Sequence, residues 1–446
     1  MKPCTLAIMV LVFLSGCAQA PDSATDTPNQ VANLDNSTHE LFELGQDLDA
    51  AIEIAPGVFQ ARGTANAQAI VTSEGTIIID TGLSNQPRVQ EQLLEAISGP
   101  ISHVVLTHAH ADHYSATESF ADDQTEVVAH AEFPHNQRYL KELSPLLMSR
   151  NAIFFPDNTP AIPGVLSDLV RYLYPTVEPT RILHEPWVIE QGGVRIEIIP
   201  TPGAEGADGL SVWLPDQEIL FTGDLFGTTF PMWPNLTSMR GERARFPKPY
   251  MDSLNRILEL DPKMLVPSHF APIEGKEKIR AGLRRMRDAI AYVEQEVFDG
   301  MNAGKDVHTL MREIQLPPEL ALPEPHGKVS WGVRSIWEAY TGWFHLQETS
   351  ELYPVPRRDV YPELVEMAGG ADVLAARARK RLDEGKTIEA LHLTEIALAA
   401  EPENQYALQA EANILANLLV ESQRANHFET FWLEHQIRRN HAQEFR

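Results

Sequence analysis

The sequence predicts an α/β domain followed by an all-α domain. Up to about residue 275, short apolar runs typical of β-strands alternate with helical stretches. Beyond that point, the apolar residues recur mainly at helical spacing. The length of 446 residues is about three times the ~150 residues usual for one domain. We therefore expect an α/β domain over residues 51–275 and a helical domain over residues 276–446.

The predicted strands are rich in Val, Ile, Thr and Phe, which favour an extended backbone. They cover residues 58–61, 69–72, 76–79, 103–107, 127–129, 194–199, 210–214 and 218–222, and a short apolar run follows later at 264–266. Predicted helices at 86–97, 132–147 and 250–260 separate some of these strands. Such a mixture of hairpins and crossovers is typical of a sheet-containing α/β domain.

The second half of the chain reads as helices joined by proline-rich connectors. Long helices are predicted at 276–301 and 329–344, and a connector at 316–325 holds four prolines. Between residues 372 and 435, Ala and Leu recur at helical spacing in a pattern that resembles one and a half tetratricopeptide units. Because such repeats need about three neighbours to bury their faces, we expect this segment to pack on the rest of the chain or on a second subunit.

Composition excludes several classes of protein. Hydrophobic residues make up 43% and charged residues 22% of the chain, which argues against collagen, bulk disorder and a polytopic membrane protein. Lys and Arg number 36 against 62 Asp and Glu, a net charge of −26. A field of this sign repels phosphate backbones, so we expect no nucleic-acid partner.

The N-terminus resembles a bacterial lipoprotein signal. An apolar run at 6–14, too short to span a bilayer, precedes Leu14-Ser15-Gly16-Cys17. We expect residues 1–16 to be a signal peptide, Cys17 to be lipidated, and residues 17–50 to form a flexible tether. The resemblance implies membrane contact through the lipidated N-terminus, on a periplasm-facing outer-membrane lipoprotein of the bacterial cell envelope. The alternative is plain cleavage after Ala18 or Ala20. Because Cys4 and Cys17 are the two cysteines of the chain, no disulfide framework and no Cys-based zinc site is expected.

The strongest signal for chemistry is the run Thr107-His108-Ala109-His110-Ala111-Asp112-His113, which follows directly on an apolar strand. Three imidazoles and a carboxylate on one loop suit a borderline-soft divalent metal. The run resembles the metal-binding motif of the metallo-β-lactamase superfamily. Asp224, His269 and Asp80 follow or precede it at positions that match this superfamily. The resemblance implies an αββα sandwich in which Asp224 bridges two metals and Asp80 orients ligands.

One departure from the superfamily pattern resembles the class III alkylsulfatases. Thr201-Pro202-Gly203 is followed by Ala204-Glu205, and in those enzymes a Glu replaces the usual His ligand. The run from Asn235 to Gly241 resembles their Asn-Leu-x-x-x-Arg-Gly motif, in which Asn and Arg hold the sulfate. A guanidinium such as that of Arg240 donates several hydrogen bonds in a fixed fork, which suits a tetrahedral oxyanion. The helical half resembles the alkylsulfatase dimerisation domain, which implies a homodimer.

A second departure lies near residue 330. There the sequence resembles the alkylsulfatase Gly-Thr-Val-Ser-His-Asn stretch, but Trp331 and Gly332 replace its His and Asn, and that His contacts sulfate in the family. His326 is a candidate to lean into the site instead, and its alternative reading is an ordinary loop histidine.

The resemblance implies a hydrolase with two Zn²⁺ per chain, acting on alkyl sulfate esters through a metal-bridging hydroxide. His108, His110 and Glu205 would hold one metal and Asp112, His113 and His269 the other, with Asp224 bridging; Asp112 and Asp224 are the catalytic candidates. Asn235 and Arg240 would bind a small anionic ester. Two alternatives stay open: hydrolysis of another ester or amide (a phosphodiester, lactone or β-lactam), and a non-catalytic, lipid-tethered binding protein.

Overall fold

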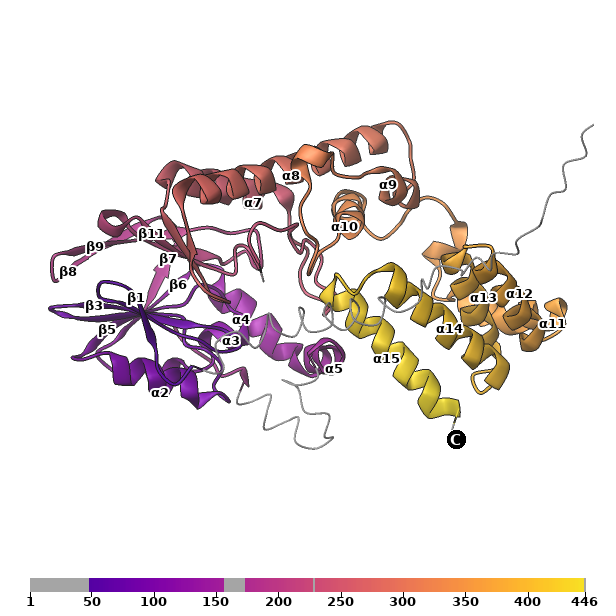
Figure 1. The fold of residues 1–446 in the computed structure, drawn as a ribbon, viewed down its shortest axis with the longest axis horizontal. Coiled ribbons are helices and arrows are strands. Elements are labelled where there is room, and N and C mark those ends of the chain that lie inside the picture. The colour runs from indigo at the N-terminus through magenta and orange to yellow at the C-terminus, as the bar shows by residue number, and fades with distance from the viewer. Residues whose placement is uncertain (1–47, 156–172, 228, 445–446) are drawn as a thin grey trace, which may run out of the picture.

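The computed structural model describes residues 48–155, 173–227 and 229–444. Two β-sheets pack face to face, and helices cover the outer face of each (Figure 1). An all-helical region follows, so the predicted αββα sandwich with a helical second domain is confirmed. The predicted signal peptide, Cys17 and the predicted tether up to residue 47 lie outside the described residues.

The first sheet has seven strands in the order of the sequence. Its first four strands pair antiparallel, and the pairs from β4 to β7 are parallel. The strands are β1 Ile52–Ala55, β2 Val58–Ala61, β3 Ala67–Thr72, β4 Gly75–Ile79, β5 Ile101–Val105, β6 Glu126–His130 and β7 Arg181–Leu183. The parallel pairs direct the C-terminal ends of β4 and β5 to the same edge of the sheet, where the His-rich motif begins.

The second sheet has six strands, which are antiparallel except for the pair β11 and β12. The strands are β8 Trp187–Gln191, β9 Val194–Pro200, β10 Leu210–Leu214, β11 Ile219–Gly223, β12 Met264–Pro267 and β13 Ile273–Glu274. Because β11 and β12 run in the same direction, the residues that follow them, Asp224 and His269, emerge at one edge. This edge faces the loop after β5.

The core between the sheets explains the strand pattern. Ile77 and Ile79 of β4 are fully buried against residues of the second sheet such as Ile196 and Ile198. Ile78 points the other way and packs with Leu93 of a helix. Side chains alternate along a strand, so a continuous apolar run here fills two interfaces at once.

Helices cover both sheets. Those over the first sheet are α2 Pro87–Ala96, α3 Ala111–Tyr114, α4 Phe133–Glu142 and α5 Ser144–Phe154. Those over the second are α7 Pro247–Leu260, α8 Lys276–Asn302, α9 Val307–Glu313 and α10 Val329–Thr341. The junction at residues 275 and 276 falls between β13 and α8, and α8 packs on the second sheet. The domain limits 51–275 and 276–446 remain a prediction, although α8 shares a core with the sandwich.

The remaining helices form an antiparallel array. They are α11 Tyr361–Ala368, α12 Ala371–Asp383, α13 Thr387–Ala400, α14 Gln405–Glu421 and α15 His427–Glu444. Helices α12 to α14 pack on one another, and α15 packs on α14 and on α5. In Figure 1 the array extends to one side of the sandwich, and α15 begins beside α5 and runs away from it to the C-terminus. The tetratricopeptide-like segment thus buries its last helix against the α/β domain through Phe154, Phe428 and Phe431.

Two predicted helices end elsewhere than expected. The stretch 132–147 forms parts of α4 and α5, which separate at Leu143; Pro145, which has no N–H to donate, takes the second position of α5. The stretch 329–344 is helical to Thr341, because Gly342 adopts a φ of 73°. Trp343 lies beyond the helix and is 70% exposed. Strands β1, β7, β8 and β13 were not predicted. Among the described residues, no helix is both long enough and apolar enough to cross a membrane.

Candidate metal centre and adjoining pocket

Asp80 joins three segments beneath the candidate metal centre. It follows β4 and is fully buried. Its Oδ1 accepts the backbone N–H of Thr107 at 2.8 Å, and its Oδ2 accepts the Thr107 hydroxyl at 2.9 Å. The same Oδ2 accepts the Ser268 hydroxyl at 2.7 Å and lies 2.9 Å from Nδ1 of His113. One carboxylate therefore fixes the start of the motif, His113 and the residue before His269.

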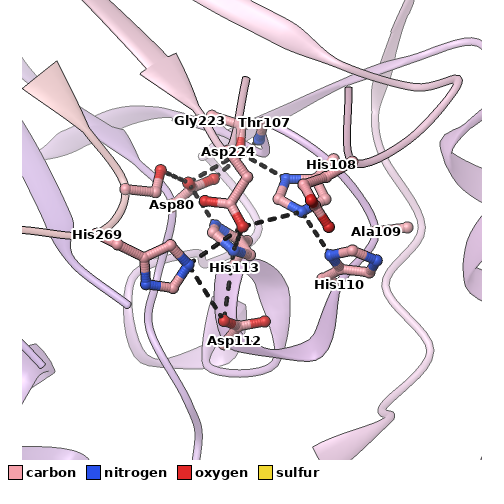
Figure 2. A network of polar contacts seen from close by, with 12 residues as sticks. Asp80, Thr107, His108, Ala109, His110, Asp112, His113, Gly223, Asp224 and His269 are labelled. Atoms are coloured by element: carbon pink, nitrogen blue, oxygen red, sulfur yellow. Dashed lines mark hydrogen bonds and ion pairs between the residues drawn. The ribbon is translucent and has the colours of Figure 1, made fainter. Parts of the chain in front are cut away.

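The histidines of one half of the centre present Nε2 to the same two carboxylates (Figure 2). Nε2 of His113 lies 3.3 Å from Asp224 Oδ2 and 3.5 Å from Asp112 Oδ2. Nε2 of His269 lies 3.1 Å and 3.8 Å from the same two atoms. The Nδ1 atom of His269 lies 2.6 Å from the carbonyl oxygen of Thr64. An acceptor at Nδ1 keeps the proton there and leaves the Nε2 lone pair for a metal.

The other two motif histidines face each other. Nε2 of His108 lies 2.8 Å from Nδ1 of His110 and 3.8 Å from Asp224 Oδ2. The outer nitrogen of His110, Nε2, lies 3.3 Å from Oε2 of Glu242. The inner nitrogens of the two rings thus converge at one point. Asp224 lies between this pair and the other half of the centre (Figure 2).

Three groups of potential ligands have their donor atoms within 4.8 Å of one another among the described residues. They are His108 with His113 and Asp224, Asp112 with His113 and His269, and His110 with Glu205 and Glu242. All seven predicted metal ligands therefore lie in this cluster. Glu205 also accepts a hydrogen bond from Arg245 Nη1 at 2.7 Å. Glu242 is an addition that the sequence did not indicate.

The residues fit divalent metal binding. Nε2 of His113 and Oδ1 of Asp224 are buried without a hydrogen-bond partner in the described part of the chain. Buried polar atoms normally have a partner, and Nε2 of His113 faces the carboxylates of Asp112 and Asp224. A donor set of imidazoles and carboxylates is the one that zinc accepts in catalytic sites.

The charges are arranged for cation binding. Burial and the neighbouring His113 and His110 hold the pKa of His108 well below its usual range, which leaves a neutral imidazole. Burial alone would raise the pKa of Asp224, but His269 and His113 outweigh it and hold that pKa well below its usual range. Asp112 is shifted in the same direction: burial opposes the shift, and His113 and His269 prevail. Against burial, the carboxylates Asp224 and Asp112 raise the pKa of His113 well above its usual range and that of His269 above it. These two imidazoles would release a proton when a metal binds, because neutral histidine and ionised carboxylate are the metal-binding forms.

A pocket of about 150 Å³ opens beside the metal-binding residues. Asn235 and Arg240 line it, on the segment between β11 and α7. The Nε atom of Arg240 and the Oδ1 atom of Asn235 are buried without a hydrogen-bond partner in the described structure. The Nη2 atom of Arg240 donates to Glu242 Oε1 at 2.8 Å. Arg240 thus keeps its Nε–H as an unpartnered buried donor at the pocket.

Part of the pocket lining is apolar. Side chains from α4, α5, α15 and neighbouring loops contribute to it: Leu83, Leu140, Leu147, Phe155, Leu173 and Phe428. Phe428 belongs to the helical domain, and its ring packs edge to face with Phe154 at a centroid distance of 5.2 Å. The pocket therefore has a metal-binding end, a cationic side and an apolar wall.

His326 and Trp331, the two residues near position 330 singled out from the sequence, lie in different surroundings. His326 lines the pocket, and burial, His427 and Arg240 hold its pKa well below its usual range. Trp331 instead packs against the cluster of Phe154, Phe428 and Phe431 and is not among the described side chains that line the pocket. The indole therefore does not form a pocket wall. Arg245, which pairs with Glu205 and with Glu242, was also not predicted, because nothing in the motif marks it.

Comparison with known proteins follows the same division of the chain. Residues 62–269 match the family model of the metallo-beta-lactamase superfamily, and residues 306–440 match that of alkyl sulfatase dimerisation. A linear primary-alkylsulfatase of Pseudomonas sp. is 27% identical over 80% of this chain and 71% of its own length. An (R)-specific secondary-alkylsulfatase of Pseudomonas sp. is 26% identical over 84% of this chain and 60% of its own.

Solved structures agree on the fold. A stereoselective inverting sec-alkylsulfatase from Pseudomonas sp. superposes with a TM-score of 0.77, at 22% sequence identity, over 93% of this chain and 70% of that one. The chain thus spans roughly two thirds of the length of the relatives it matches. The first matched region covers most of the two sheets. The second includes α9 and α10, which pack on the second sheet, and most of the helical array. The chain joins a domain of the metallo-β-lactamase superfamily to an alkyl sulfatase dimerisation domain.

Proposed function

We propose that the protein is a metal-dependent hydrolase of alkyl sulfate esters with two zinc ions per chain. The observation that carries this proposal is that one pocket combines the metal-binding residues, the Arg240 guanidinium and an apolar wall. An alkyl sulfate has an anionic head on an apolar chain, and these features match its two parts. The alkylsulfatase names of the relatives support the same substrate class.

The metal-binding residues would be those predicted. His108, His110 and Glu205 would bind one ion, and Asp112, His113 and His269 the other, with Asp224 between them. When bound, a zinc pair lowers the pKa of water toward ~7 and supplies a hydroxide nucleophile at neutral pH. The chain itself orients these ligands through Asp80 and through the carbonyl oxygen of Thr64.

Arg240 and Asn235 would bind the sulfate group. The unpartnered Nε–H of Arg240 provides a charge-assisted donor, and the Asn235 side chain supplies an amide. The assignment of oxygen and nitrogen within an amide depends on its partners, so a sulfate oxygen would turn the NH₂ group toward itself. These contacts accelerate the reaction only if they strengthen as the leaving group departs.

The helical domain would form a homodimer. Between α10 and α11 the chain exposes several large apolar side chains, among them Trp343, Leu346 and Tyr353, which are 70%, 83% and 64% exposed, and Met367 of α11 is 76% exposed. A large exposed apolar patch commonly marks an interface. Light scattering of the purified chain should give the mass of a dimer, and Trp343→Glu with Met367→Glu should give that of a monomer.

The envelope location is also part of the proposal. Lipidation at Cys17 would attach the enzyme to the outer membrane, facing the periplasm. Mass spectrometry of the protein expressed with its own N-terminus should show a lipid on Cys17, and Cys17→Ser should move the protein from the membrane to the soluble fraction. An unlipidated protein cleaved after Ala18 or Ala20 would contradict the anchor and leave the site untouched.

Metal analysis combined with a substrate panel tests the function. The panel is dodecyl sulfate, a secondary alkyl sulfate, bis-nitrophenyl phosphate and nitrocefin. Two zinc ions with release of sulfate are expected. Two zinc ions with turnover of only the phosphodiester or the lactam would overturn the substrate class, and no turnover of any ester would favour a binding protein.

A further inference from the structure

Glu242 is a buried carboxylate with three cationic or imidazole partners. Its side chain is 5% exposed. Oε1 accepts from Arg240 Nη2 at 2.8 Å, and Oε2 accepts from Arg245 Nη2 at 2.6 Å and lies 3.3 Å from His110 Nε2. Two guanidinium groups thus face one buried carboxylate and favour its charged form. Glu242 is therefore an anion inside the protein.

The partners of Glu242 belong to two different parts of the pocket. His110 directs Nδ1 to His108 and Nε2 to Glu242. A carboxylate at the outer nitrogen of a histidine keeps the proton there and orients the ring toward a metal. Arg240 belongs to the cationic side of the pocket. Glu242 is the residue that contacts both.

We propose that Glu242 is a positioning residue that links the metal-binding His110 to the anion-binding Arg240. This inference rests on the proposed function, because it gives His110 and Arg240 the roles assigned there. The negative charge of Glu242 also limits how strongly the pocket attracts anions. Arg240 and Arg245 carry two positive charges, and Glu205 and Glu242 carry two negative ones.

The proposal predicts opposite effects on the two ligands. Without the carboxylate charge, His110 keeps at most a weaker amide acceptor for its proton, so metal binding should weaken. The same change removes a negative charge beside Arg240, so an anion should bind as tightly or more tightly. A purely structural ion pair would not separate the two affinities in this way, because loss of structure weakens both.

The test compares the wild type with Glu242→Gln, which keeps the size of the side chain and removes its charge. Glu190→Gln is the matched control, since Glu190 pairs with Arg195 on the exposed surface of the second sheet. Zinc affinity is measured against a competing chelator. Inorganic sulfate is then titrated calorimetrically into the zinc-saturated protein, and kcat and KM are measured with hexyl sulfate.

In Glu242→Gln, one of the two zinc ions should bind about 10- to 100-fold more weakly, the cost typical of losing a partner that orients a ligand. Sulfate should bind at least as tightly as to the wild type, and kcat should fall without a rise in KM. The control should match the wild type throughout. Zinc affinity within twofold of the wild type, or weaker sulfate binding with zinc affinity retained, would overturn the proposal.

Glu242→Asp keeps the proposal testable if the glutamine variant does not fold. It retains the charge but shortens the side chain by one methylene, which removes the contact with His110. Zinc should again bind more weakly, and sulfate affinity should stay at the wild-type value; unchanged zinc affinity would refute the link. A wild type that binds zinc and sulfate but releases no sulfate from esters would contradict the proposed function, while the two titrations would still decide the role of Glu242.

Discussion

The two polar sides of the pocket are built in different ways. The metal-binding side lies at the ends of strands β4, β5, β11 and β12, and Asp80 fastens its segments through backbone and side-chain hydrogen bonds. The cationic side lies on residues 235–245, which form no regular element. There, Arg240, Glu242 and Arg245 are arranged by ion pairs with one another and with Glu205.

The difference between the two sides shows that a sequence motif determines side-chain geometry most directly at the end of a buried strand. At the end of a buried strand, the direction of the chain is fixed by the sheet, so the spacing of residues in a motif translates into geometry. In a segment without regular structure, the side chains arrange one another. The metal side should therefore fail when a ligand is lost, whereas the cationic side should respond to the balance of its charges.

The largest effect is expected at the residue shared by both halves of the metal centre. Asp224→Asn keeps the shape but removes the charge, so the metal content should fall below two per chain and kcat/KM should drop more than about 100-fold, beyond the cost of losing an outer partner. Elemental analysis and hexyl sulfate turnover measure this. Asp216→Asn, in an exposed turn of the same sheet, is the control. Full metal content and full turnover in Asp224→Asn would contradict the expectation that the metal-binding side fails when one ligand is lost.

The cationic side should affect charged substrates selectively. Arg240→Ala should raise KM for alkyl sulfates by about 10- to 100-fold, the range for loss of a hydrogen bond to a charged group. An uncharged ester should be affected little, and the metal content should stay at two. Equal loss on both substrates would mean that Arg240 supports the fold. Arg195 of β9 forms an exposed ion pair, and the control Arg195→Ala should change neither the KM for alkyl sulfates nor the turnover of the uncharged ester.

The apolar wall allows a smaller test with a matched pair. Phe428 lines the pocket, whereas Phe431 lies in the same aromatic cluster without being one of the pocket-lining residues. Phe428→Leu and Phe431→Leu should each cost less than about 1.5 kcal/mol of stability. Only Phe428→Leu should shift the preferred alkyl length, as measured by kcat/KM across a series from butyl to dodecyl sulfate. If both variants shift the preferred alkyl length equally, the shift comes from the packing of the aromatic cluster and not from the pocket wall.

The smallest effect concerns a carboxyl far from the pocket. Glu411 of α14 is buried and accepts from Asn440 Nδ2 at 2.6 Å, and burial raises its pKa above the usual 4.5. The folded chain therefore holds this proton more tightly than the unfolded chain, so the wild type loses stability as the pH rises through the folded pKa. Glu411→Gln should gain at most about 1 kcal/mol at pH 8. Denaturant unfolding should show no gain below pH 4.5, where both states are protonated.

Much of the architecture and of the metal centre was predictable. Every predicted strand overlaps an observed one, because the buried strands of this sandwich are short runs rich in apolar residues. His108, His110, Asp112, His113, Asp224 and His269 followed such strands or a short apolar run, and Glu205 was marked by its place after Thr201-Pro202-Gly203. The structure places all seven in one cluster.

The rest depended on contacts between distant segments. Glu242 and Asp208 are ordinary acidic residues in the sequence, yet Asp208 accepts the backbone N–H of Ala109 at 2.8 Å across 99 residues. Strands β7 and β8 are short and partly exposed, so their apolar pattern is weak. Phe428 could not be assigned to a pocket from sequence, because its position there depends on how α15 packs against α5.

The contact between α15 and α5 makes the two domains depend on each other. A helical array attached only through its N-terminal linker would be an interchangeable module, and one partner could be replaced without changing the other. Here a side chain of the last helix reaches the pocket, so each domain imposes a requirement on the other. In a chimera that carries the helical domain of a relative, a different side chain would replace Phe428 in the pocket lining. The pocket for the alkyl chain would then change, even with every metal ligand retained.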